Sequence, residues 1–66
     1  MSMEATTTTR IEDLTTGQVV VSRKGLIYEI TGTPIIGRVF VEVPYRTLSG
    51  NTEYLTGRPG QMVSVA

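Results

Sequence analysis

The chain contains no cysteine, no histidine and no tryptophan, and each absence excludes a class of structure or chemistry. Without cysteine there is no disulfide framework, and without cysteine or histidine the usual ligands of a zinc site are missing. The serines also lack the histidine that normally activates a serine nucleophile. We therefore expect a non-enzymatic chain with no catalytic residues, no metal site and no cofactor.

Long apolar runs and strongly charged segments are missing too. No apolar run approaches the roughly 18 residues of a membrane span, and the first residues lack the basic and apolar segments of a secretory signal. The chain has six basic and six acidic side chains. From residue 14 onward five basic and three acidic side chains leave a net charge of +2, which is less than a dedicated nucleic-acid binder carries. We expect a cytoplasmic location and no membrane partner.

With 66 residues, the chain forms one small domain. A core of this size supplies only about 3–5 kcal/mol, so self-association would add useful stability. Residues 1–10 are polar and include four consecutive threonines. We predict a flexible tail over residues 1–12 and a folded domain over residues 13–66. At the boundary, Ile11 and Leu14 are spaced like one helical turn, which would pack Leu14, and with it Ile11, against the sheet.

Alternating apolar and β-branched residues then predict strands and almost no helix. Residues 18–22 and 26–31 form a first hairpin, in which Gly25 supplies the positive φ of the turn. Residues 38–43 alternate so that Val39, Val41 and Val43 share a face, and the strand bends at Pro44 before it resumes. A turn centred on Gly50-Asn51 would pair Tyr45 with Thr56 and Thr47 with Tyr54.

The last twelve residues contain Gly57-Arg58-Pro59-Gly60, which has two interpretations. One is an arginine hook for the DNA minor groove, but a single arginine without basic neighbours neutralises too few phosphates. The other is a tight corner before a final strand over residues 61–66. Proline fixes φ and glycine permits unusual dihedral angles, so the sequence favours the corner.

These elements amount to five short strands separated by turns every eight to twelve residues. A chain this short protects its strand edges best by closing the sheet. The sequence therefore predicts an all-β fold: a small five-stranded β-barrel with a flexible N-terminal tail.

The order of these segments resembles the small Src-homology-3-like barrels, including the Tudor-like and KOW-like types and short bacterial or phage proteins. The resemblance covers residues 13–66 and is carried by Asp13, Leu14 and Gly17, by Tyr28 and Ile30, and by the corner over residues 57–60. It implies a module that binds protein, binds nucleic acid or assembles with itself, such as an accessory or regulatory protein. The proline-peptide binders of this class have an aromatic-rich groove, whereas this chain has only four aromatic residues.

Some apolar residues fall outside the predicted core. Ile27 and Phe40 lie opposite the apolar faces of their strands, and Ile35 and Ile36 fall in a loop. If these four residues meet, they form an exposed apolar patch that would bind a protein partner or a second copy of the chain. The alternative, in which they plug one end of the barrel, stays open. Protein binding or self-association is our first functional hypothesis.

Nucleic-acid binding is the alternative hypothesis. A modest basic patch would use Arg23 and Lys24 at the first hairpin turn, together with Arg46 and Arg58. The same patch would include Tyr45 and Tyr54 as stacking groups if their shared face is exposed. If that face instead continues the valine face of the third strand, both tyrosines belong to the core, and the sequence leaves the choice open.

Overall fold

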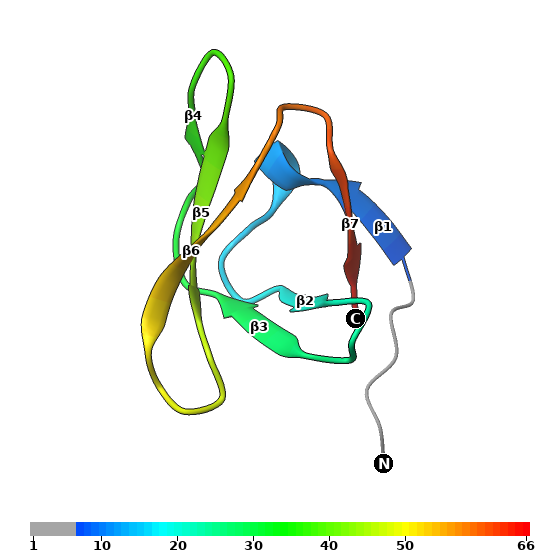
Figure 1. Ribbon diagram of the computed structural model, residues 1–66, viewed down its shortest axis with the longest axis vertical. Coiled ribbons are helices and arrows are strands. Elements are labelled where there is room, and N and C mark those ends of the chain that lie inside the picture. The colour runs from blue at the N-terminus through cyan, green and yellow to red at the C-terminus, as the bar shows by residue number, and fades with distance from the viewer. Residues whose placement is uncertain (1–6) are drawn as a thin grey trace.

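The computed structural model describes residues 7–66, which form an all-β fold with a single turn of 3₁₀ helix (Figure 1). Seven strands make one antiparallel sheet. In chain order the elements are β1 (Thr7–Arg10), η1 (Ile11–Asp13), β2 (Val19–Val21), β3 (Ile27–Ile30), β4 (Ile35–Ile36), β5 (Val41–Arg46), β6 (Thr52–Gly57) and β7 (Met62–Val65).

Strand β5 organises the sheet because three strands pair with it. On one edge, β3 pairs at Tyr45 and Arg46 while β4 pairs at Val41 and Glu42. On the other edge, β6 pairs along its whole length. Beyond β3, the neighbouring strands across the sheet are β2, then β7, then β1.

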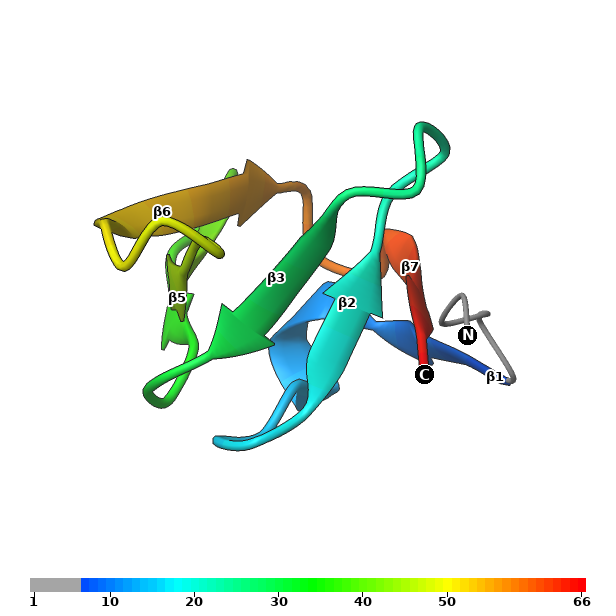
Figure 2. The ribbon, with the colours of Figure 1, turned by 90° about the horizontal axis from the view of Figure 1, so that it is seen from below.

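The sheet curls around its core without closing (Figures 1 and 2). Within residues 7–66, β6 pairs only with β5 and β1 pairs only with β7. The all-β class is confirmed, but the prediction of five strands in a closed barrel is wrong. The two additional strands are β1 and β4, which come from the predicted tail and from a predicted loop.

The core lies on the concave face of the curled sheet. Alternation along β5 buries Val41 and Val43 and leaves Glu42 exposed, as the period of a strand requires. Four further apolar or aromatic side chains pack at the border of the core: Tyr28, Tyr45, Leu55 and Val63. The buried set is Ile11, Leu14, Val20, Ile30, Val41, Val43 and Val65.

The N-terminal part of the described chain belongs to the sheet. Residues Thr7–Arg10 form β1, which pairs with β7. Ile11 begins η1, and it is fully buried together with Leu14. The predicted tail over residues 1–12 is therefore wrong for residues 7–12, where backbone pairing and one buried isoleucine order the chain. Residues 1–6 of that prediction lie outside the described residues.

The corner between β6 and β7 is confirmed, and it holds η1 in place. The Gln61 N–H donates to the Arg58 carbonyl at 3.0 Å, and Gly60 has a φ of +85°, as the third position of a type II turn requires. The Gly60 N–H donates to Glu12 Oε1 at 2.7 Å, and the Ile11 N–H donates to the Gln61 carbonyl at 2.8 Å. This corner is thus a structural junction between distant parts of the chain.

The two longest hairpins turn in the same way. In the β2–β3 hairpin the Ser22 N–H donates to the Leu26 carbonyl, and Gly25 has a φ of +79°, as predicted. In the β5–β6 hairpin the Thr47 N–H donates to the Asn51 carbonyl, and Gly50 has a φ of +90°. Each loop has three residues and ends on a glycine, the arrangement of a type I turn with a bulge.

This loop changes the predicted register of β5 and β6. The prediction of a two-residue Gly50-Asn51 turn is wrong, because Gly50 ends the loop instead of beginning a type II′ turn. Tyr45 consequently pairs with Glu53, and Pro44 pairs with Tyr54. Neighbouring positions on a strand face opposite sides of the sheet, so Tyr45 and Tyr54 lie on opposite faces.

The predicted loop around Ile35 and Ile36 is a short hairpin. Ile35 pairs with Glu42 and Ile36 pairs with Val41. The Gly37 N–H donates to the Phe40 carbonyl at 2.9 Å, which leaves Arg38 and Val39 at the tip. The prediction of a strand that begins at residue 38 with Val39 on the core face is therefore wrong, since the chain reverses there.

Candidate functional site

The β4–β5 hairpin carries the largest group of exposed apolar side chains that are close in sequence. We call residues 35–42 the arm, which extends past the rest of the sheet in Figure 1. Exposed apolar groups of this kind mark interaction sites on small soluble domains. The exposed fractions of the residues are 60% for Ile35, 65% for Ile36, 61% for Val39 and 54% for Phe40.

The ladder register separates the arm into two faces. Residues directly opposite in an antiparallel pair share a face, so Ile35 lies on the side of exposed Glu42. Ile36 lies on the side of Val41, which is fully buried. Phe40 precedes Val41 and therefore faces the side of Ile35 and Glu42. We call the side with Ile35, Phe40 and Glu42 the outer face of the arm.

The structure places Ile35, Ile36 and Phe40 on one hairpin, with Ile36 on the opposite face, and leaves Ile27 elsewhere. Ile27 is partly buried and pairs with Val21 at the far end of β3. Strand β3 meets β5 near Arg46, whereas the arm begins at the opposite end of β5. The patch predicted from four residues therefore consists of three of them plus Val39. Their exposure argues against the alternative of a plug at the end of the sheet.

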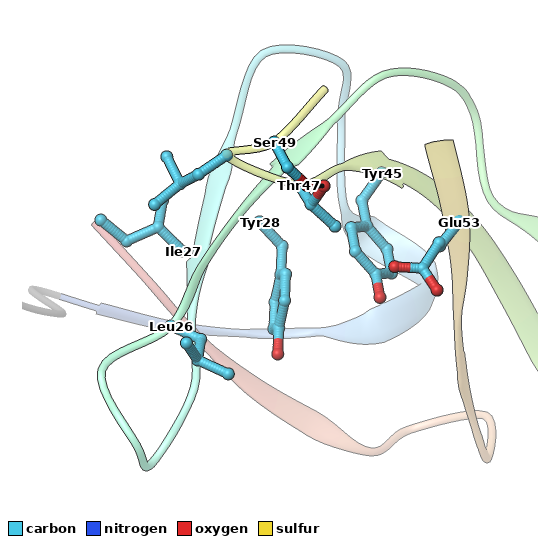
Figure 3. Close-up of a pocket in the computed structure, with 8 residues that line it drawn as sticks. Leu26, Ile27, Tyr28, Tyr45, Thr47, Ser49 and Glu53 are labelled. Carbon is cyan, nitrogen blue, oxygen red and sulfur yellow. Dashed lines mark hydrogen bonds between the residues drawn. The ribbon is translucent and has the colours of Figure 1, made fainter. Parts of the chain in front are cut away.

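Ile27 instead lines a hollow at the other end of β5 (Figure 3). This hollow has a volume of about 440 Å³ and lies between the β2–β3 and β5–β6 hairpins. The rings of Tyr28 and Tyr45 are tilted by 55°, with their centroids 4.7 Å apart. The lining residues are Leu26, Ile27, Tyr28, Tyr45, Thr47, Leu48, Ser49 and Glu53.

Tyr45 has an altered acidity in this hollow. Burial raises the pKa of its phenol above the ordinary value of 10.0, and the negative charge of Glu53, its ladder partner, adds to the increase. Tyr28 contributes in the same direction. The neutral phenol therefore persists here to a higher pH than in a solvated tyrosine.

The residues of the nucleic-acid hypothesis do not form one stacking surface. Arg23 and Lys24 are exposed at the β2–β3 turn, and Arg58 is exposed at the β6–β7 corner. Arg46 is paired with Glu29 at 2.6 Å.

The two tyrosines of that hypothesis also separate. Tyr45 packs at the border of the core, whereas Tyr54 is 57% exposed on the opposite face. The predicted shared face of Tyr45 and Tyr54 is therefore wrong, and the β5–β6 register is the reason.

Sequence reasoning missed three exposed apolar residues on the body of the domain. Leu26 and Met62 are about half exposed, and Leu48 is 84% exposed at the β5–β6 turn. Leu48 directly precedes Ser49-Gly50, a turn signal that could have placed it in a solvated loop. Leu26 and Leu48 line the hollow from two different hairpins, whereas Met62 lies on β7 outside its lining.

Among residues 7–66 there is no group of three or more acidic side chains placed to hold a metal ion. The single helical turn among residues 7–66 has neither the length nor the apolar character needed to cross a membrane. No family model matches the chain, and no curated protein and no solved structure matches it either.

Proposed function

We propose that this chain is a non-enzymatic protein-binding module whose binding surface is the arm. One observation carries the proposal: four exposed apolar side chains gather on a single protruding hairpin of eight residues. Isolated exposed apolar residues are normal on small domains, but several of them on one short hairpin are typical of an interaction surface.

Because these side chains are exposed, they contribute little to the stability of the fold and can contribute to binding. Full burial of an aliphatic or aromatic side chain contributes about 1.5–3 kcal/mol. More than half of each side chain in the group is still exposed, so roughly 1 kcal/mol per residue is available on binding. Removal of these side chains should therefore weaken association far more than it weakens the fold.

The fold supports the proposal through analogy. We retain the resemblance to the small Src-homology-3-like barrels as part of the proposal, with the sheet left open between β6 and the β1–β7 pair. Modules of that class act through surfaces more often than through reactive centres, although a fold does not determine a function. Nucleic-acid binding has less support, because the basic side chains are dispersed and Arg46 is already paired with Glu29.

The proposal is tested by two substitutions in the arm, Ile36→Ser and Phe40→Ser, made in one chain. We expect this variant to lose the partner, or the self-association, that the unmodified chain shows in capture and sedimentation experiments. Leu48→Ser is the matched control, because Leu48 is equally apolar and 84% exposed at the opposite end of β5. Loss of association in the Leu48 variant, or its retention in the arm variant, would contradict the proposal.

A further inference from the structure

We propose that the partner of the arm is a second copy of this chain, and that two arms pack antiparallel, outer face to outer face, about a two-fold axis. This inference rests on the proposed function and identifies the partner. Two-fold pairing requires a surface that is complementary to itself. The outer face carries apolar groups and the negative charge of Glu42, and the tip beside it carries the positive charge of Arg38, which together meet that requirement.

The two charges of the arm are separated along the hairpin, and neither forms an ion pair with another residue of the described chain. Arg38 lies at the tip, and Glu42 lies beside Ile35 on the outer face. Within residues 7–66 the one ion pair joins Arg46 and Glu29. Three ladder rows separate the tip from Glu42, which corresponds to about 10 Å at the rise of a strand.

This separation selects one arrangement of two arms. When the arms run antiparallel and each tip lies over the Glu42 row of the other copy, Arg38 of each chain meets Glu42 of the other. The two Phe40 side chains then lie between these charge pairs and are removed from water, and each Ile35 lies in the same ladder row as its own Glu42, beside a charge pair. A parallel arrangement would place Arg38 against Arg38, and an antiparallel arrangement centred on Glu42 would place the two carboxylates together.

The arrangement predicts a weak dimer. The outer face of one arm is smaller than the roughly 800 Å² per partner of a standard interface. We therefore expect association on the order of 0.1–1 mM chain, where sedimentation and NMR titration both detect it. The charge pairs lie at the rim, so the association should weaken as salt increases.

The test exchanges the charges between two chains. Arg38→Glu and Glu42→Arg should each weaken self-association by about tenfold, because each substitution turns two attractive contacts into two repulsive ones. An equal mixture of the two variants should associate at least as well as the unmodified chain, because every cross-contact then joins opposite charges. The measurement is sedimentation equilibrium of each variant alone and of the mixture.

A second pair of variants, Lys24→Glu and Glu53→Arg, is the control for the effect of net charge. They have the same net charges as the two arm variants, but the substitutions are at exposed sites outside the arm. This control mixture should gain no association over its components. A charge-exchanged mixture that associates no better than the control mixture would overturn the inference. A chain that stays monomeric at about 1 mM would overturn it as well.

The face of the arm is tested by a pair of neighbouring residues with similar exposure. Ile35→Ser should abolish the dimer and Ile36→Ser should preserve it, because only Ile35 lies on the outer face. The opposite result would overturn the outer-face dimer and leave the arm as a binding surface. A failure of the proposed function would look different from a failure of the dimer inference. In that case the chain with both Ile36→Ser and Phe40→Ser would keep every association that the unmodified chain makes.

Discussion

Gly57 lies directly against Ile11, so closely that a Cβ atom on Gly57 would be 2.8 Å from Ile11 Cδ1. The same Cβ would be 2.9 Å from Gln61 Oε1, which accepts a hydrogen bond from the Arg58 N–H. The end of β6 is therefore fitted to η1 and to the corner that follows it. Gly57 does not have a positive φ. Glycine is therefore required here because of packing and not because of backbone conformation.

Gly57→Ala should destabilise the chain by roughly 1–3 kcal/mol, the usual cost of overpacking a buried site. The added methyl group must displace either the fully buried Ile11 or the hydrogen-bonded Gln61. Urea unfolding followed by circular dichroism measures the change. Thr56→Ala, at the exposed neighbouring position, is the control and should change the free energy of unfolding by less than about 0.5 kcal/mol. Equal stability of the Gly57 variant and this control would show that the junction is loosely packed.

Gly50→Ala should cost about 1–2 kcal/mol for a different reason. Gly50 has a φ of +90° with open space around its α-carbon, so the cost is one of backbone conformation alone. Gly50→Asn should cost less, because asparagine tolerates the left-handed region better than alanine does. Thermal unfolding of both variants compares them. If alanine and asparagine were tolerated equally, the three-residue loop with its terminal glycine would be the wrong description of this turn.

The Arg46–Glu29 pair should contribute little to stability despite its short N–O distance of 2.6 Å. Its side chains are 54% and 47% exposed, and solvent-exposed pairs contribute about 0.2–1 kcal/mol. A double-mutant cycle with Arg46→Gln and Glu29→Gln measures the coupling free energy. We expect a value below about 1 kcal/mol that decreases with added salt. A larger coupling that is insensitive to salt would mean that the pair is effectively buried.

Tyr45 should make stability depend on alkaline pH. Folding raises the pKa of its phenol, so above the ordinary value of 10.0 the unfolded chain releases a proton that the folded chain retains. This contribution to stability is complete below pH 10.0 and is lost as the pH rises through the folded pKa. Tyr45→Phe should remove that part of the alkaline loss, as measured by urea unfolding over a series of pH values.

The cause of the raised pKa is tested separately. Glu53→Gln removes one negative charge beside Tyr45 and should lower the pKa of its phenol, without restoring the ordinary value because burial is the larger cause. An NMR titration of the Tyr45 ring measures the shift, and Glu42→Gln serves as the control. A Tyr45 pKa that does not respond to Glu53→Gln would exclude the charge of Glu53 as a cause.

The sequence predicted those features that depend on local pattern. Alternation identified Val41 and Val43 as core residues, and the Gly60 and Gly25 turns followed from the conformational freedom of glycine. The helical spacing of Ile11 and Leu14 predicted one packed turn, and both side chains are buried. Each of these features is set within a few residues of the chain.

Features that depend on distant partners were not predictable in this way. Strand β1 is polar and pairs with β7 from the opposite end of the chain, so its sequence resembles a tail. Strand β4 has two residues between Pro34 and Gly37, too few to show alternation. The register of β5 and β6 depends on whether Gly50 begins or ends its loop, and that choice moved Tyr54 to the face opposite Tyr45. The sequence placed Ile35, Ile36 and Phe40 outside the core, and they are exposed, whereas it assigned the exposed Val39 to the core.

The most direct test of the central claim, self-association through the arm, is an amide NMR spectrum of the pure chain recorded on dilution from about 1 mM to about 0.05 mM, the range of a weak dimer. We predict concentration-dependent shifts confined to residues 35–42, with the signals of Leu48 and Met62 unchanged. Shifts centred on the hollow beside Tyr28 and Tyr45, or a spectrum identical at both concentrations, would contradict it.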